Sequence, residues 1–203
     1  MRLKWIFFDV GSTLVDESAA YRHRMEEIAK AAGVSYETVY NRAMEFYAKN
    51  QKGDLEAAKL LGVALPKWHT EDEVLYSDTE ECLRSVSQRY RIGVIANQSA
   101  GTAGRLERHG ILKYIDLVVA SAEEGVAKPD ARIFEIALER AGCQAREAFM
   151  VGDRVDNDII PAKALGMRTI WVRQGFGKYW NITSDRERAE YAVDCLAQVA
   201  KRV

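Results

Sequence analysis

The sequence predicts an α/β fold: a doubly wound (Rossmann-like) parallel sheet core with an inserted all-helical subdomain. Three observations predict it. In the second half of the chain, apolar runs of strand length alternate with amphipathic helix patterns, as in parallel sheets covered by helices on both faces. A similar apolar run stands apart at residues 3–8, and residues 16–88 after it carry only helical periodicity. We therefore expect a core domain of residues 1–15 and 89–203 and a helical subdomain of residues 16–88.

Each expected element follows from its own pattern. The run at 3–8 stops at Asp9 and a glycine-containing turn, which predicts a buried strand. Apolar positions at helical spacing predict the helices of the first half, at 16–33, 36–47, 54–61 and 77–88. Gly33 is a suitable stop for the first of these helices, and capping-box patterns at 70–73 and 77–80 predict helix starts. The second half adds strands at 92–96, 117–120, 148–151, 169–172 and 191–193, and helices at 102–109, 130–141 and 158–165.

Composition and charge exclude several classes of protein. The chain has 203 residues with 29 Lys+Arg against 30 Asp+Glu, and its net charge of −1 argues against a dedicated nucleic-acid coat. Its three cysteines stand singly, which fits a reducing compartment. No segment approaches the ~20 apolar residues of a membrane span, and the first apolar run is too short for a secretory signal. We expect a cytoplasmic monomer or homodimer that acts on a small-molecule substrate, with no nucleic-acid or membrane partner.

Polar residues at the expected strand ends form the candidate site. Ligands of doubly wound sheets bind beyond the carboxyl ends of the strands, where we expect Asp9, Asn97, Lys128 and Asp153. Asp153 begins a run of three carboxylates within six residues, and this charge density favours a bound divalent cation. Oxygen ligands of this kind suit Mg²⁺. Simpler interpretations are a turn former at Asp9, a solvated lysine at Lys128 and an acidic helix cap at 153–158.

Four ordered motifs give the chain a resemblance to a known family. They are Asp9-Val10-Gly11-Ser12-Thr13-Leu14, Ile92-Gly93-Val94-Ile95-Ala96-Asn97, Lys128-Pro129, and Gly152-Asp153 followed by Asn157-Asp158. In this order, with helices between the first and second motifs, they resemble the haloacid dehalogenase (HAD) superfamily of hydrolases, whose helical insertion is called the cap. The resemblance covers essentially the whole chain.

The resemblance implies a function and a role for each matching residue. It implies a Mg²⁺-dependent phosphatase in which Asp9 is the nucleophile and forms a covalent aspartyl intermediate. Lys128 would steady the nucleophile and the charge of the transferring group. The implied Mg²⁺ ligands are Asp9, the backbone carbonyl of Gly11, Asp153 and Asp158, and the implied substrate-binding residues are Lys128, Asn97 and Thr13.

Two positions depart from the family pattern. Most HAD phosphatases carry a second aspartate two residues after the nucleophile as general acid and base, and this chain has Gly11 there. General acid–base catalysis of this kind typically increases the rate about 10²–10⁴-fold. The other departure is Ala96, where the family has Ser or Thr as a phosphate hydrogen-bond donor, and the adjacent Asn97 is a partial substitute. An enzyme with Gly11 would favour leaving groups that need no protonation, such as acyl phosphates, aryl phosphates or a halide.

Three other interpretations stay open. A metal-independent 2-haloacid dehalogenase also lacks the second aspartate and needs an arginine for the halide, for which the candidates are Arg22, Arg24 and Arg42. A catalytically impaired member would keep the fold as a binding or interaction module. Residues 27–42 also resemble a helix-turn-helix DNA reader, but residues 21–49 hold five Lys/Arg against four Glu, which is no basic footprint. The three histidines, His23, His69 and His109, are too dispersed to suggest a metal trio.

Overall fold

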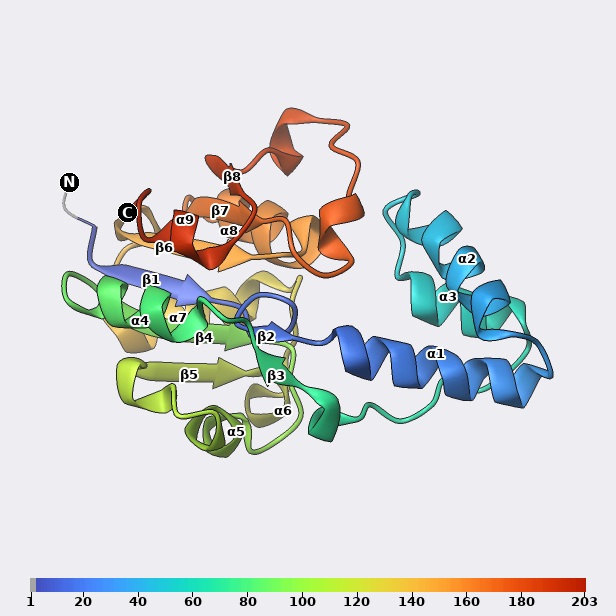
Figure 1. Cartoon of the computed structure of the whole chain (residues 1–203). Coiled ribbons are helices and arrows are strands. Elements are labelled where there is room, and N and C mark those ends of the chain that lie inside the picture. Colours follow the sequence, from blue (N-terminus) through green and yellow to red (C-terminus); the bar gives the residue numbers. More distant parts are fainter. Residues whose placement is uncertain (1–2) are drawn as a thin grey trace.

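The computed structural model describes residues 3–203, and Met1 and Arg2 of the expected core domain lie outside the described residues. Its centre is a six-stranded sheet in the order β5-β4-β1-β6-β7-β8, in which every neighbouring pair is parallel (Figure 1). The strands are β1 (Trp5–Phe8), β4 (Arg91–Ala96), β5 (Leu117–Ala120), β6 (Ala148–Gly152), β7 (Arg168–Val172) and β8 (Tyr191–Val193). The α/β class and the doubly wound parallel sheet predicted from the sequence are confirmed.

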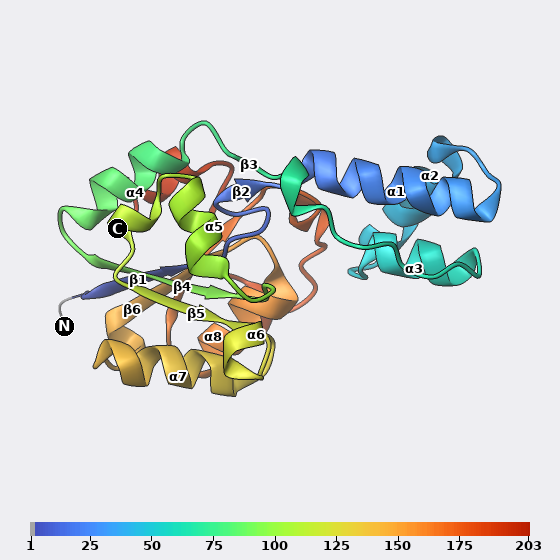
Figure 2. The ribbon, with the colours of Figure 1, turned by 90° about the horizontal axis from the view of Figure 1, so that it is seen from below.

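Alternate side chains of the first strand enter two different layers, because successive residues of a strand point to opposite faces of the sheet. Ile6 and Phe8 of β1 belong to the cluster that α4 (Thr79–Ser87), α5 (Thr102–Arg108) and α9 (Leu196–Val199) cover. Trp5 and Phe7 belong to the cluster on the other face, beneath α7 (Ala131–Ala141) and α8 (Ile160–Ala164). Figure 2 shows α4 and α5 on one side of the sheet and α7 and α8 on the other. A short helix, α6 (Ser121–Glu124), follows β5.

Three helices form a separate unit between two short strands. The helices α1 (Ser18–Ala32), α2 (Tyr36–Tyr47) and α3 (Gly53–Leu60) follow β2 (Val15–Asp16), and the chain returns to the core through β3 (Val74–Leu75). Their buried side chains, Met25, Ile28 and Val39 among them, pack into a core of their own. This helical insertion (α1–α3) projects beyond the end of the sheet in both views (Figures 1 and 2). Gly33 ends α1 in the left-handed conformation, as its sequence position predicts.

The fourth helix packs with the core. It falls within residues 16–88, which the sequence assigned to the helical subdomain, yet Cys82, Leu83 and Val86 lie in one cluster with Ile6 and Phe8 of β1. Residues 79–88 are therefore core, and this corrects the expected boundary at residue 88. Helical periodicity shows that a helix has an apolar face, but it does not reveal which partner covers that face.

Local features also differ from the sequence prediction. β2 and β3 pair as a two-stranded antiparallel sheet where only helix was expected. The expected helix start at 70–73 is a single 3₁₀ turn, Thr70–Asp72. Before α8 the chain forms a π-helical segment, Val155–Ile159, in place of a regular start at Asp158. Within residues 3–203, the structure contains no helix that combines the length and the apolar character of a membrane span.

Candidate active site

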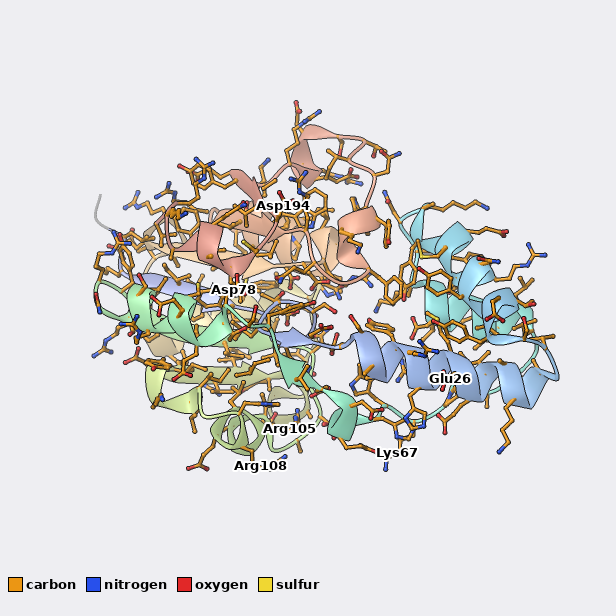
Figure 3. All side chains as sticks on the ribbon, viewed as in Figure 1. Glu26, Lys67, Asp78, Arg105, Arg108 and Asp194 are labelled. Atoms are coloured by element: carbon orange, nitrogen blue, oxygen red, sulfur yellow. The ribbon has the colours of Figure 1, made fainter. Side chains whose placement is uncertain are left out.

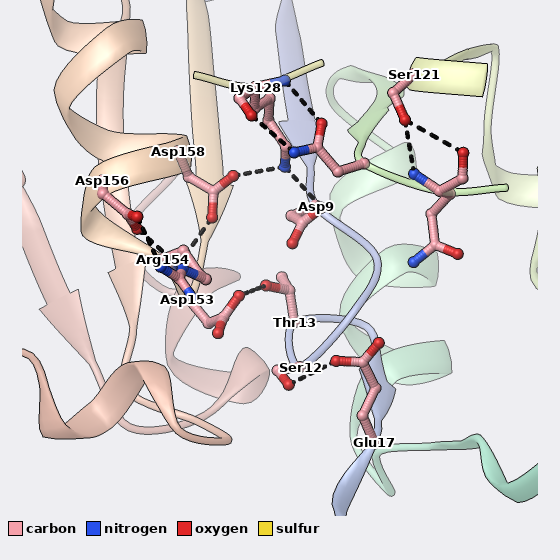
Figure 4. Close-up of polar contacts among 12 residues, drawn as sticks. Asp9, Ser12, Thr13, Glu17, Ser121, Lys128, Asp153, Arg154, Asp156 and Asp158 are labelled. Atoms are coloured by element: carbon pink, nitrogen blue, oxygen red, sulfur yellow. Dashed lines mark hydrogen bonds and ion pairs between the residues drawn. The ribbon is translucent and has the colours of Figure 1, made fainter. Parts of the chain in front are cut away.

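A buried lysine joins two carboxylates at the carboxyl end of the sheet. The Nζ of Lys128 donates to Asp9 Oδ1 over 2.7 Å and to Asp158 Oδ1 over 2.6 Å (Figure 4). The side chains of Lys128, Asp9 and Asp158 are 2%, 12% and 0% exposed. Asp153 lies beside them, and one oxygen each of Asp9, Asp153 and Asp158 come within 4.8 Å of one another. The structure thus brings together the four charged residues that the sequence singled out for the site.

Three neighbouring strands position this cluster. Asp9 directly follows β1, and Asp153 directly follows β6, which pairs with β1 in parallel. On the other side of β1, Asn97 directly follows β4. Lys128 comes from the loop after α6. Since parallel strands point the same way, their carboxyl ends deliver all these residues to one rim of the sheet.

Asn97 holds the backbone of the lysine. Its amide nitrogen donates to the Lys128 carbonyl over 2.8 Å, and its amide oxygen accepts from the Lys128 N–H over 2.7 Å. The side chain that the sequence suggested for substrate binding is therefore engaged in fixing the loop that carries Lys128. It acts as a positioning residue in this structure.

Asp153 is fixed by three contacts of its own. The buried hydroxyl of Thr13, the other residue suggested for substrate binding, donates to Asp153 Oδ1 over 3.4 Å, which is long for a hydrogen bond. The indole N–H of Trp171 donates to the Asp153 backbone carbonyl over 2.8 Å. Gly177 packs so close that a Cβ added there would lie 2.3 Å from that carbonyl oxygen. Only glycine leaves Asp153 room in this position.

The cluster carries more negative than positive charge. Lys128 is one ammonium among three carboxylates, which leaves two negative charges, and the nearby Arg154 pairs with Asp156. Burial raises the pKa of Asp153 well above its ordinary value, and the carboxylates of Asp158 and Asp9 raise it further. Burial also raises the pKa of Asp158, to about 7, against the opposing effect of Lys128.

The lysine remains charged in this environment. Burial acts to lower the pKa of Lys128, but the carboxylates of Asp158 and Asp9 outweigh burial and raise it above its ordinary value. The site therefore has a fixed positive charge and an excess of carboxylate oxygens around it. A buried excess of negative charge is costly unless a cation balances it.

These residues fit a magnesium ion. Its two positive charges would balance the cluster, and carboxylate oxygens are the ligands that Mg²⁺ prefers. Asp9 and Asp153 each use one carboxylate oxygen in the hydrogen bonds given above. Asp158 uses both of its oxygens, since Oδ2 accepts from the Arg154 N–H over 3.0 Å. Asp9 and Asp153 are therefore better placed than Asp158 to bind a metal directly.

A carboxyl group from another residue fills the space where Gly11 has no side chain. A Cβ added at Gly11 would lie 2.4 Å from Glu17 Oε1 and 2.8 Å from Glu17 Cδ. Glu17, just before α1, is 8% exposed and accepts a hydrogen bond from Ser12 Oγ over 2.9 Å. Burial raises the pKa of Glu17 to about 8 although the Ser12 bond lowers it. Sequence reasoning missed Glu17, because its approach to Gly11 depends on the turn between β1 and α1.

Comparison with known proteins identifies the family. A family model described as haloacid dehalogenase-like hydrolase matches residues 6–172, which is most of the chain. The chain belongs to the haloacid dehalogenase-like hydrolases. This hydrolase is 30% identical to the glyceraldehyde 3-phosphate phosphatase of Pyrococcus furiosus, over 98% of its own length and 92% of the relative's.

Other similarities agree with the family. The hydrolase is 33% identical to the glyceraldehyde 3-phosphate phosphatase of Pyrococcus abyssi, over 85% of its own length and 82% of the relative's. Its fold is similar to that of YfnB from Bacillus subtilis, described as a HAD-hydrolase and crystallised with magnesium. The TM-score is 0.70 at 16% identity, and the match covers 100% of this chain and 99% of YfnB.

A cleft lies between the helical insertion and the core of the hydrolase. It has a volume of about 530 Å³ and includes Ser12, the hydrogen-bond partner of Glu17. Its aromatic lining consists of Tyr21, Tyr36, Tyr40, Tyr76, Phe176 and Tyr179, and its cationic lining of Arg22, Arg173 and Lys178. Another pocket, of about 590 Å³, is lined by Lys4, Cys143 and Glu147 among others, and neither it nor the cleft is lined by Asp9, Lys128, Asp153 or Asp158.

The three arginines considered for halide binding have different surroundings. Arg24 donates to Asp54 over 2.9 Å within the insertion, and Arg42 pairs with Glu45 on an exposed surface. Of the three, Arg22 alone lines the cleft, where it also pairs with Glu26. The cleft thus offers positive charge to an anionic substrate.

Proposed function

We propose that this hydrolase is a Mg²⁺-dependent phosphatase that acts on a small phosphorylated metabolite through an aspartyl-phosphate intermediate on Asp9. The observation that carries the proposal is the contact of Lys128 with Asp9 beside the buried carboxylates of Asp153 and Asp158. The names of the relatives support a phosphate ester as substrate. The excess of buried carboxylates supports a bound cation, which a metal-independent dehalogenase would not need. A cytoplasmic monomer or homodimer completes the proposal, and the three free cysteines agree with a reducing compartment.

Asp9 and Asp153 would hold the Mg²⁺, with the backbone carbonyl of Gly11 as a further oxygen ligand and Asp158 beside them. When bound, the ion supplies positive charge to the oxygens of the transferring phosphoryl group. Lys128 supplies a second positive charge and, through its bond to Asp9 Oδ1, orients the nucleophile. Asp158 holds the other side of the lysine.

The reaction has two halves. In the first, a carboxylate oxygen of Asp9 bonds to phosphorus as the bond from phosphorus to the leaving oxygen breaks. In the second, a water oxygen bonds to the same phosphorus, the bond to Asp9 breaks, and phosphate is released. The leaving oxygen of an alkyl phosphate needs a proton in the first half, and the attacking water must lose one in the second.

We assign both proton transfers to Glu17. Its carboxyl group occupies the space beside Gly11 that the acid–base aspartate of related phosphatases would require. With a pKa raised to about 8 by burial, Glu17 holds a proton at neutral pH, and the Ser12 hydroxyl stabilises the carboxylate once that proton has left. Under this assignment the protein can also use leaving groups that need a proton. The expected restriction to acyl phosphates, aryl phosphates or a halide would then apply only to variants that lack the Glu17 carboxyl group.

The cleft supports a small, anionic and hydrogen-bonding substrate. Lys178 offers positive charge, Arg22 and Arg173 would have to share theirs with Glu26 and Asp194, and the tyrosines offer hydroxyl groups beside apolar rings. Among residues 3–203, the buried Oε1 of Gln174 in the cleft lining has no hydrogen-bond partner. It would accept a hydrogen bond from a substrate hydroxyl. The helical insertion would thus act as the cap that selects the substrate.

A panel of phosphorylated metabolites, with and without Mg²⁺, tests the function. The wild-type protein is expected to release phosphate from members of the panel only with Mg²⁺, and Asp9→Asn is expected to abolish turnover. Asp185→Asn, which alters a fully exposed side chain, is the matched control and should behave as wild type. Release of halide from a 2-haloacid without Mg²⁺, and no release of phosphate, would contradict the proposal.

The variant Glu17→Gln tests the acid–base role, because glutamine keeps the size and the acceptor for Ser12 but has no carboxyl proton. With an alkyl phosphate, the first half-reaction is expected to slow by about 10²–10⁴. With p-nitrophenyl phosphate, whose leaving group needs no proton, the burst of p-nitrophenol should persist while later turnover slows. If Glu17→Gln slowed the first half-reaction equally for the alkyl phosphate and for p-nitrophenyl phosphate, the assignment would be refuted.

A further inference from the structure

A cluster of histidines and carboxylates lies in the helical insertion, outside the cleft. His23 and Glu27 are one turn apart on α1 and so share one side of the helix. His69 comes from residues 61–73, the return segment between α3 and β3. Ligating atoms of His23, Glu27 and His69 come within 4.8 Å of one another. The expectation that the three histidines form no metal trio is not contradicted, because only two of them meet here, and the third group is Glu27.

The path of the chain explains why they meet. The return segment runs alongside α1 in both ribbon views, and Figure 3 labels Glu26 on α1 and Lys67 on the return segment. Residues far apart in sequence thus face each other across a short gap. The side chains of His69, Glu27 and His23 are 16%, 39% and 42% exposed, so an ion can reach them from solvent.

Each imidazole is oriented by a carboxylate at its Nδ1. His23 Nδ1 lies 2.8 Å from Asp72 Oδ2, and His69 Nδ1 lies 2.9 Å from Glu71 Oε1. The two rings stack with their centroids 3.8 Å apart and their planes 13° apart, so one ring must turn about its Cβ–Cγ bond before both Nε2 lone pairs can meet at one ion. A histidine that donates from Nδ1 to a carboxylate presents the lone pair of Nε2, which is how most metal-binding histidines are held.

The Nε2 of His69 faces a third carboxylate. It lies 3.1 Å from Glu27 Oε2, while Nδ1 of the same ring already faces Glu71. A neutral imidazole has one N–H and can satisfy only one of these carboxylates. Protonation of the ring satisfies both carboxylates, as the hydrogen bonds to Glu71 and Glu27 that raise the pKa of His69 favour, and a metal ion between Nε2 and Glu27 is the alternative. Two ligands of a tetrahedral ion with bonds of about 2.1 Å are ~3.4 Å apart, close to the separation found here.

We propose that His23, His69 and Glu27 bind a zinc ion, with water as the fourth ligand. Two imidazoles and one carboxylate are a ligand set that suits Zn²⁺, whereas the all-carboxylate cluster at Asp9 and Asp153 suits Mg²⁺. The ion would fasten the return segment to α1 and so stiffen the connection between the insertion and the core. This site does not depend on the proposed phosphatase function.

Metal content under competition tests the zinc site. Chelator-stripped protein is dialysed against micromolar Zn²⁺ in millimolar Mg²⁺, which saturates the all-carboxylate cluster, and its zinc is measured by mass spectrometry. Wild type and the control His109→Ala, which changes the third histidine beyond α5, are expected to retain one zinc per chain. His23→Ala and His69→Ala are expected to lose it, and Glu27→Gln to weaken binding at least tenfold. Circular dichroism verifies that each variant is folded.

Cobalt and heat give two independent readouts. Co²⁺ bound by two histidines should give visible absorption bands that disappear in His69→Ala and persist in Asp153→Asn, which alters the other cluster. Zinc at 100 times its Kd should raise the Tm of wild type and of Asp153→Asn by about 5–10 °C, and should leave His69→Ala unchanged. Zinc retained equally by His69→Ala and wild type, zinc lost in Asp153→Asn, or no zinc in wild type would each overturn the proposal.

Discussion

At the scale of single residues, Gly11 and Glu17 compete for one volume in the turn that follows Asp9. The space that a side chain at position 11 would need is the space that the Glu17 carboxyl group occupies. The two positions therefore depend on each other: a glycine at 11 permits the buried glutamate, and the glutamate excludes an aspartate at 11. Two carboxylates placed so close together would also repel each other.

This dependence predicts the outcome of a double-mutant cycle. Gly11→Asp alone is expected to lower both Tm and turnover of an alkyl phosphate, because the new side chain collides with Glu17. Gly11→Asp combined with Glu17→Ala is expected to recover much of both, with a coupling energy of about 1–3 kcal/mol in stability. Urea unfolding and steady-state assays of wild type, the two single variants and the double variant measure this coupling energy and the turnover. Strictly additive effects would contradict the shared volume.

The raised pKa of Glu17 predicts how stability depends on pH. Because burial raises this pKa from 4.5 to about 8, the native protein binds more protons than the unfolded chain between these values, and the free energy of unfolding falls as pH rises through that window. Glu17→Gln removes this contribution. Relative to wild type, the variant should gain about 2–4 kcal/mol between pH 5 and pH 9. Urea unfolding without divalent cations measures the difference, and parallel pH profiles would disprove it.

At the scale of elements, the pairing of β1 and β4 depends on a missing side chain. Phe7 of β1 pairs in register with Gly93 of β4, and its ring covers the glycine. A Cβ added at Gly93 would lie 2.4 Å from two ring carbons. These two strands end at Asp9 and Asn97, so their packing also sets the spacing of the site.

Gly93→Ala is therefore expected to lower the free energy of unfolding by about 1–3 kcal/mol through overpacking. A fall in Tm of about 3–10 °C should accompany it. Gly104→Ala in α5 is the matched control, because a Cβ there meets only Arg108 Nη1 at 3.9 Å. The control should be neutral or stabilising by up to about 1 kcal/mol. Similar Tm values for Gly93→Ala and Gly104→Ala would show that the Phe7 ring can move aside without lowering the free energy of unfolding.

The core elements could be predicted from the sequence for a physical reason. Strands covered on both faces appear as continuous apolar runs, such as residues 92–96, and helices on the surface show a 3.6-residue period. The small sheet of β2 and β3 could not be predicted in this way, because two residues per strand are too few to show a period. The partner of α4 was also missed, since an apolar face does not say what covers it.

Some residues of the candidate site could also be predicted from the sequence, and others could not. Asp9, Lys128 and Asp153 could be predicted to lie together because each follows a strand of one sheet or lies in the next loop. Glu17 and the pair of His23 and His69 could not, because their positions depend on how turns and the return segment cross other elements. The hydrogen-bonding role of Asn97 toward Lys128 is likewise visible only in the structure.

At the scale of the whole molecule, several contacts join the helical insertion to the core, and the edge-on pair of the Tyr21 and Phe176 rings is one of them. The Asn50 side chain exchanges two hydrogen bonds with the Asn181 backbone, of 2.8 and 2.7 Å. The Phe176 ring stacks on Tyr47, with centroids 4.3 Å apart and planes 2° apart. Both core residues belong to the segment between β7 and β8. This segment therefore sets how the insertion sits over the cleft.

Phe176→Ala is expected to loosen that arrangement. Loss of the stacked ring should speed amide hydrogen exchange in α2 and α3 by about 3–10-fold, from a lost interaction of about 0.5–1.5 kcal/mol. The amides of β1 and β6 should exchange at the wild-type rate. Leu60→Ala, at an exposed position of α3, is the control and should leave all these rates unchanged. Faster exchange throughout the sheet would mean that the contact supports the entire fold.

The site is assembled from distant parts of the chain, and this has a consequence during protein synthesis. Asp9 and Lys128 are 119 positions apart, and Asp153 and Asp158 emerge from the ribosome after both. A growing chain that already contains Asp9 still lacks β6 and the carboxylates that follow it. Under the proposed function, such a chain lacks the carboxylates that would hold the cation, so hydrolysis by a nascent chain would have to await the synthesis of residues 153–158.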